Sequence, residues 1–96
     1  MQKIQIANEV VSAIACTAIL EVEGVASVGK HSRKKKGVTL HRENGNVQIT
    51  ADIVVKSGSK IQNVACEVQH KVKNAVETMT GFTASEVNVH VSGLVV

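Results

Sequence analysis

Residues 46–94 constrain the fold more strongly than any other part of this chain, because they combine two strand patterns with one helix pattern. Along residues 46–55 the apolar side chains occupy odd positions, which places them on one face of a strand. In residues 61–79 they recur at helical spacing, and Gly81 supplies a left-handed residue at which a helix can end. Residues 86–91 alternate again. This stretch therefore predicts a strand, an amphipathic helix and a second strand.

The predicted helix has a start signal and one apolar stripe. Ser59 and Gln62 have the spacing of a capping box, in which each side chain accepts a hydrogen bond from the backbone N–H of the other residue. The stripe that should face the core consists of Ile61, Val64, Ala65, Val68, Val72, Ala75, Val76 and Met79.

The first quarter of the chain predicts a short strand followed by a helix. Residues 3–6 alternate, Asn8 is a good N-cap, and the helix should run to about Glu23. Its core stripe would be Val11, Ile14, Ala15, Ala18 and Val22. No charged residue occurs between Val10 and Leu20, so the side of this helix that faces away from the core is also apolar or small.

Two interpretations of this charge-free helix stay open. A helix that is apolar all round is usually covered all round, which favours a self-association or partner surface centred on Cys16, Ile19 and Leu20. In the alternative, Ala13, Cys16 and Thr17 are simply small residues that need no cover.

A basic loop separates the two halves of the chain. Residues 24–29 turn into a short extended segment, and residues 30–37 contain no apolar side chain, which predicts a solvated, mobile loop. Its cations are Lys30, Arg33, Lys34, Lys35 and Lys36.

Asn44 and Gly45 form the strongest hairpin signal, since alternating residues flank them on both sides. If these two residues form the turn, the opposed pairs are Arg42 and Val47, His41 and Gln48, Leu40 and Ile49, Thr39 and Thr50, and Val38 and Ala51. Apolar residues then meet apolar ones in the middle of the hairpin and polar residues meet polar ones, which supports this register.

These elements predict one domain over residues 1–96 with an α+β fold. Ninety-six residues, 44% of them hydrophobic, suffice for one core and are too few for two. The second face of the sheet is polar and carries Thr39, His41, Gln48, Thr50, Asp52, Asn88 and His90. A two-layer sandwich follows, with both helices on one face of a small mixed or antiparallel sheet. The expected strand order is a split β-α-β arrangement of ferredoxin-like type.

The chain also resembles a known family. The relevant segments are Glu21-Val22-Glu23-Gly24-Val25-Ala26, Val64-Ala65, Val68-Gln69, Val72-Lys73, Ala75-Val76-Glu77, Met79-Thr80-Gly81 and Glu86-Val87-Asn88-Val89-His90-Val91. Together they resemble the alkaline shock protein family, small envelope stress response proteins of Gram-positive bacteria. The resemblance implies proteins that gather near the membrane through a separate membrane-anchored partner and can self-assemble. This chain is little more than the core domain of such proteins, without the charged tails of some relatives.

Catalytic chemistry is not favoured by the sequence. Asp52 is the one aspartate and should lie on the polar sheet face, while seven glutamates are scattered over helix ends, turns and exposed faces. The sequence has no Gly-rich phosphate loop, nucleophile elbow or nucleotide-binding fingerprint. Phe82 is the only aromatic residue, which disfavours a roomy ligand pocket. We expect no enzymatic activity, no cofactor and no small-molecule substrate.

A metal site is also not favoured. Cys66 and His70 lie four residues apart on the second helix, and His41 and His90 share the polar sheet face. No CxxC or HxxxH pair completes a set of four ligands. Cys16 and Cys66 are expected to remain thiols, as a reducing compartment permits.

The basic loop has more than one candidate ligand. Five cations within seven residues suit anionic lipid headgroups or nucleic-acid phosphates. RNA-binding surfaces add aromatic or arginine stacking platforms, and this chain has one Phe and two Arg. A membrane surface or an acidic protein is therefore favoured over RNA, and a loop that is basic only for solubility stays open.

We therefore expect a non-enzymatic cytosolic protein of the envelope stress response that self-associates and binds a membrane-anchored protein partner. The absence of an apolar run of about 20 residues and of a secretory signal predicts a cytoplasmic protein, and the resemblance implies a place at the inner face of the cell membrane. The alternative is a small RNA- or nucleic-acid-binding module that uses the basic loop and the open sheet face.

Overall fold

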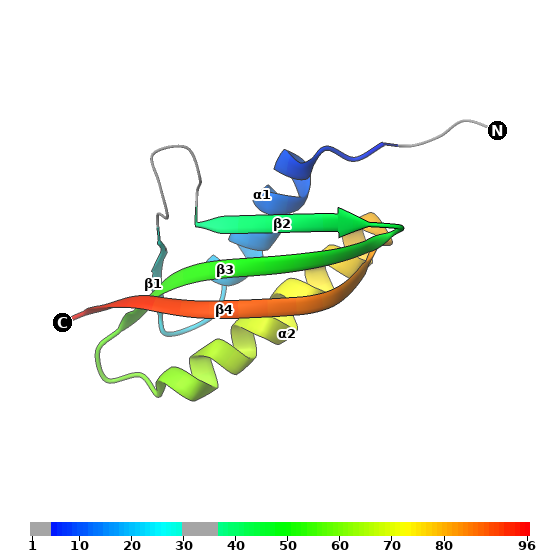
Figure 1. Cartoon of the computed structure of the whole chain (residues 1–96). Coiled ribbons are helices and arrows are strands. Elements are labelled where there is room, and N and C mark those ends of the chain that lie inside the picture. Colours follow the sequence, from blue (N-terminus) through cyan, green and yellow to red (C-terminus); the bar gives the residue numbers. More distant parts are fainter. Residues whose placement is uncertain (1–4, 30–36) are drawn as a thin grey trace.

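Two helices cover one face of a four-stranded sheet in the computed structural model of this chain, which describes residues 5–29 and 37–96 (Figure 1). The elements in chain order are α1 (Asn8–Leu20), β1 (Val25–Val28), β2 (Val38–Glu43), β3 (Asn46–Lys56), α2 (Ile61–Thr80) and β4 (Thr83–Val95). The expected α+β class and its two-layer arrangement are confirmed. In this described part of the chain, neither helix combines the length and the hydropathy that crossing a bilayer requires.

β3 is the central strand of the sheet. One of its edges pairs with β1 and β2, which follow each other along β3 and are both antiparallel to it. Its other edge pairs with β4, which is parallel to β3. The sheet is therefore mixed, and β4 forms one of its outer edges.

The strand order differs from the expected split arrangement. Helix α2 connects β3 and β4, and these two strands are direct hydrogen-bonded neighbours, whereas a split unit has another strand between them. Gln5 and Ile6, the described part of the predicted first strand, lie outside any strand. Arg42 donates hydrogen bonds from Nη1 to the carbonyl of Ile6 and to Oδ1 of Asn8. These bonds hold the segment at the end of β2, on the other side of β3 from β4.

The predicted hairpin between β2 and β3 is confirmed in its register. Asn44 and Gly45 have φ angles of 48° and 81°, the left-handed conformation that both central residues of a type I′ turn adopt. All predicted pairs, from Arg42 with Val47 to Val38 with Ala51, are present.

Helix α2 buries the middle of its predicted stripe. Val64, Val68, Val72 and Val76 are buried against the core, whereas Ile61 and Met79 at the two ends are 47% and 68% exposed. Gly81 ends the helix at φ 80°, as predicted.

The predicted capping box at the start of α2 is wrong. Lys60 is the N-cap, and no side chain caps the helix. Ser59 lies beside Gly24 instead, since a Cβ atom added to Gly24 would be 3.1 Å from Ser59 Oγ.

Helix α1 is shorter than predicted, and four of the five residues predicted for its core stripe are buried. Ala7 rather than Asn8 is the N-cap, and the helix ends at Leu20 with Glu21 as C-cap. The buried residues of this segment are Val11, Ala15, Ala18, Ile19 and Val22. Ile19, predicted for the association surface, is completely buried, whereas Ile14, predicted for the core, is only half-buried.

Ile19 and its neighbour Leu20 provide a test of this helix phase. Ile19→Ala removes a fully buried side chain and should destabilise the protein by about 2–4 kcal/mol, while Leu20→Ala should cost less than about 1 kcal/mol because Leu20 is 56% exposed. Urea unfolding followed by circular dichroism measures both values. Equal losses for the two variants would contradict the placement of Ile19 in the core.

Candidate functional site

The two ends of the basic segment meet at one residue of the central strand. Gly29 donates its backbone N–H to the carbonyl of Asp52 at 2.7 Å, and Asp52 donates its own N–H to the carbonyl of Gly37 at 2.7 Å. The chain therefore leaves the sheet and returns to it beside Asp52. The predicted loop cations, Lys30, Arg33, Lys34, Lys35 and Lys36, lie outside the described residues.

Asp52 is buried, so the prediction that its carboxylate is solvated is wrong. It is 3% exposed although its position in β3 alternates onto the helix-free face. Gly29 lies against it, because a Cβ atom added to Gly29 would be 3.0 Å from Asp52 Cγ; the same atom would be 2.9 Å from Ser92 Oγ. The Asp52 carboxylate therefore lies next to Gly29, the last described residue before the five cations of residues 30–36.

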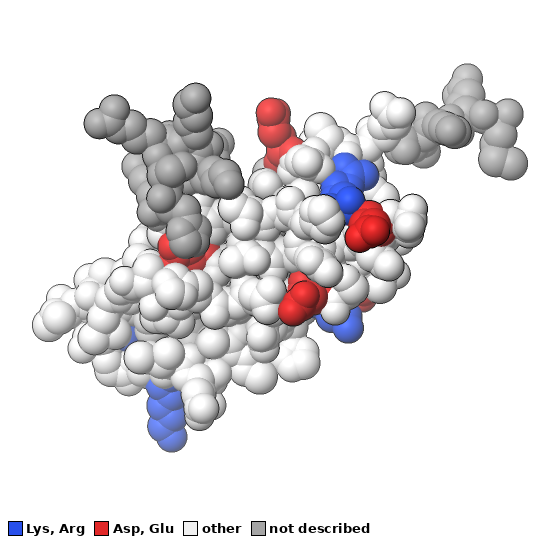
Figure 2. Space-filling model, in the orientation of Figure 1, with Lys and Arg blue, Asp and Glu red and all other residues white. Residues whose placement is uncertain are grey.

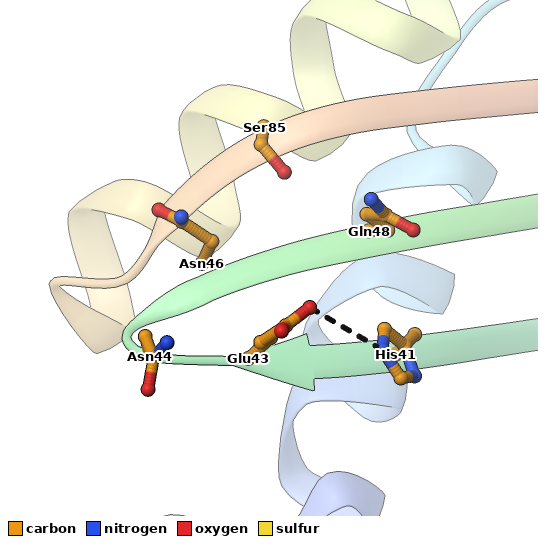
Figure 3. Close-up of a pocket in the computed structure, with 6 residues that line it drawn as sticks. All are labelled: His41, Glu43, Asn44, Asn46, Gln48 and Ser85. Carbon is orange, nitrogen blue, oxygen red and sulfur yellow. Dashed lines mark ion pairs between the residues drawn. The ribbon is translucent and has the colours of Figure 1, made fainter.

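The helix-free face of the sheet has a shallow polar hollow at its hairpin end. Its volume is about 270 Å³, and the side chains that line it come from β2, β3, β4 and the turn (Figure 3): His41, Glu43, Asn44, Asn46, Gln48 and Ser85. His41 Nε2 lies 3.9 Å from Glu43 Oε2, and both side chains are more than 70% exposed. Figure 2 shows that most side chains on this face are uncharged and that described Lys and Arg side chains lie toward its margins. The described part of this face therefore offers little positive charge to phosphates.

The histidines and cysteines considered as metal ligands do not converge. Cys66 and His70 are exposed on α2, whereas His41 pairs with Gln48 and His90 with Asp52, which places the two strand histidines four residues apart along β3. Four residues of a strand span about 13 Å. Among the residues of ranges 5–29 and 37–96, no three His, Cys, Asp or Glu side chains are grouped so that they could hold a metal ion.

An apolar groove runs between α1 and α2. It has a volume of about 550 Å³, and the residues that line it are Glu9, Val10, Ala13, Ile14, Thr17, Ala18, Glu21, Ala75 and Met79. Val10 is 49% exposed and Met79 is 68% exposed, so apolar area in this groove faces solvent. The helices therefore carry an apolar surface outside the core.

The groove does not include Cys16, Ile19 or Leu20, the residues predicted for an association surface. Those three residues do not form one exposed surface, because Ile19 is buried, Cys16 is half-buried and only Leu20 is exposed. The signal that pointed to a surface was the charge-free stretch of α1. The sequence predicted four buried residues of this segment correctly, but it did not show that Ile19 is buried as well, since nearly every side of the helix is apolar or small.

Comparison with protein families gives one match over the whole chain. Residues 1–96 match the model of the alkaline shock protein 23 family, which is described as having a cell envelope-related function.

Curated proteins of two Gram-positive bacteria are similar to this chain. YloU of Bacillus subtilis is 30% identical over 96% of this chain and 88% of its own length, and YqhY of the same organism is 32% identical over 96% and 76%. Spy1535 of Streptococcus pyogenes serotype M6 is 38% identical over 91% of this chain and 72% of its own length. All three are described as uncharacterized.

Solved structures of the MamM CTD share the fold. A copper form has a TM-score of 0.63 at 17% identity, covering 91% of this chain and 98% of the MamM chain. A nickel form has a TM-score of 0.61 at 18% identity, covering 88% and 96%. At this identity the likeness concerns the backbone arrangement alone.

Proposed function

We propose, from the premise that this chain belongs to the alkaline shock protein 23 family, that it is a non-enzymatic cytosolic protein that acts in cell-envelope homeostasis by associating with other proteins. An envelope-related role follows from the family, and the earlier resemblance is confirmed by the match over residues 1–96. The mode of action that we propose is self-association together with the binding of a membrane-anchored protein partner at the inner face of the cell membrane.

The observation that carries this proposal is the groove between α1 and α2. Soluble domains rarely leave contiguous apolar area exposed without a partner for it. Here Val10 and Met79 are about half or more exposed beside the half-buried Ile14 and Ala75. Surfaces of this kind suit the docking of another protein better than the binding of a small polar substrate.

A pull-down from cells with detergent-solubilised membranes, carried out at low and at high salt, tests the proposed function. Contact through a folded apolar surface should survive high salt, because screening weakens charge interactions and leaves apolar burial intact. We expect one membrane protein to be recovered at both salt concentrations. Recovery of nucleic acid alone, lost at high salt, would contradict the proposal.

The second candidate function is nucleic-acid binding through the basic segment. It is favoured by the backbone hydrogen bonds of Gly29 and Gly37 to Asp52, because these bonds hold the residues on either side of the basic segment at one place on the sheet. Anionic lipid is the competing ligand for the same charges.

Replacing Lys34, Lys35 and Lys36 together with Gln distinguishes these ligands. The melting temperature should change by less than about 4 °C, because a segment without apolar side chains is predicted to bury nothing, and a change of about 0.5 kcal/mol shifts the melting temperature of a domain of this size by about 2–4 °C. Binding to vesicles that contain anionic lipid should weaken, at about 1 kcal/mol for each cation removed. Co-sedimentation with vesicles and with RNA, over a range of salt concentrations, measures both affinities. Tighter wild-type binding to RNA than to vesicles, with a salt slope that flattens in the variant, would favour the second candidate.

A further inference from the structure

The groove between α1 and α2 is chemically apolar even where a hydroxyl lines it. Thr17 Oγ1 donates a hydrogen bond to the carbonyl of Ala13 at 2.9 Å, within the same helix. The hydroxyl is therefore satisfied and Thr17 needs no polar partner in the groove. Ala13 and Thr17 are small and exposed, so a bound helix could approach the backbone of α1 closely between Val10 and Ile14.

Acidic residues lie at both ends of this groove. Glu9 in the first turn of α1 and Glu21, its C-cap, both line the groove, and their separation of twelve residues corresponds to about 18 Å along a helix. Glu21 Oε2 lies 3.8 Å from Lys71 Nζ, and both side chains are more than half exposed. An exposed pair of this kind is weak and leaves the carboxylate accessible to another cation.

These charges disfavour a second copy of the chain as the occupant. In a twofold contact of two antiparallel α1 helices centred between Ala13 and Thr17, Glu9 of one copy would lie near Glu21 of the other. In a parallel twofold contact each glutamate would meet its own equivalent. Like charges come together in both arrangements, which is unfavourable.

We propose that this groove binds an amphipathic helix of a partner protein, about three turns long, with an apolar stripe and basic residues at both ends. The apolar stripe fills the space between Val10, Ile14 and Met79, and the basic ends lie near Glu9 and Glu21. Helix-in-groove binding of this kind uses apolar anchors spaced at i, i+3 or i+4, and i+7. The inference rests on the proposed function and specifies the surface and the partner chemistry for it.

Fluorescence anisotropy with labelled synthetic peptides tests this inference on the full chain. The first probe is a helical peptide of about sixteen residues with leucines at that spacing and arginines at both ends. The second has the same composition in scrambled order, and the third has glutamate in place of arginine. We expect the first peptide to bind at least tenfold more tightly than either of the others.

Two substitutions to arginine form a matched pair for this experiment. Ala13→Arg places a long cation in the groove and should weaken binding of the first peptide at least tenfold. Asn63→Arg makes the same kind of change at an exposed position of α2 that does not line the groove, and should leave binding within about twofold. Ala13 is exposed, so both proteins should show cooperative unfolding by circular dichroism. The double variant Glu9→Gln and Glu21→Gln should bind the arginine peptide more weakly than the wild type does, and should bind a peptide with neutral ends with unchanged affinity.

Three results would overturn the inference. The first is equal affinity for the ordered and the scrambled peptide, or unchanged binding by Ala13→Arg. The second is a wild-type dimer in sedimentation that Ala13→Arg converts to a monomer, which would make a second copy the occupant. The third is binding to neutral lipid vesicles that Ala13→Arg removes, which would assign the groove to a membrane.

The outcome for the groove can be separated from the outcome for the proposed function. If Ala13→Arg protein still recovers the same membrane protein in the pull-down, partner binding stands and the groove is not the contact. If the wild type recovers no protein partner, the proposed function fails, while the peptide measurements still decide whether the groove binds a basic amphipathic helix.

Discussion

Val68→Asp is expected to abolish the folded state. Val68 is completely buried in the middle of α2, within the row of valines packed in the core. A carboxylate at this position loses its hydration and finds no cation among the aliphatic side chains around it, at a cost of several kcal/mol. Domains have total stabilities of only about 5–15 kcal/mol, so this loss should remove most or all of the stability. Urea titration followed by circular dichroism should then show no cooperative transition.

The matched control is Asn74→Asp, which adds the same acidic group to an exposed position of α2. Its free energy of unfolding should stay within about 0.5 kcal/mol of the wild type. A cooperative transition of the Val68 variant at the wild-type midpoint would mean that α2 does not pack on the sheet as described.

Gly37→Ala is expected to have the second largest effect. Gly37 has φ +76°, and a Cβ atom there would lie 1.7 Å from the carbonyl oxygen of Gly29. That contact is with backbone, so relief requires Gly29 and Gly37 to separate and their hydrogen bonds to Asp52 to weaken or break. The combined strain and lost bonds should cost more than about 3 kcal/mol, measured by the same urea titration.

Gly45→Ala isolates the part of this cost that comes from the backbone angle alone. Gly45 has φ +81°, close to that of Gly37, and nothing lies within 4 Å of the position of its Cβ. Its substitution should cost about 1–2 kcal/mol, the penalty for a left-handed non-glycine residue. Equal losses for the two alanine variants would show that the chain at Gly37 can move away from Gly29 without loss of stability.

Local patterns predicted the elements that depend on residues close in sequence. The register of the β2–β3 hairpin was predictable because the turn at Asn44 and Gly45 and the alternation beside it specify the same pairs. The end of α2 at Gly81 and its buried valines followed from helical spacing in the same way.

Contacts between distant residues account for the predictions that were wrong. Asp52 looked solvent-exposed because alternation places it on the polar face, and its burial depends on Gly29, which lies 23 residues earlier in the sequence. The edges of the α1 core stripe were misplaced because the helix has almost no polar side, so Ile19 was assigned to the surface and the half-buried Ile14 to the core. The groove needs residues of both helices, and Ala75 and Met79 had been assigned to the core stripe of α2.

Because Gly29 and Gly37 both bond to Asp52, the two ends of the basic segment are held at one place on the sheet, and its sequence can change independently of the rest of the fold. Its two anchor points, Gly29 and Gly37, are fixed by backbone hydrogen bonds to Asp52 of β3. Doubling the length of a flexible loop with fixed ends costs only about 0.6 kcal/mol of closure free energy. The length and charge of this segment can therefore vary at little cost in folding free energy, while the groove on the helical layer stays unchanged.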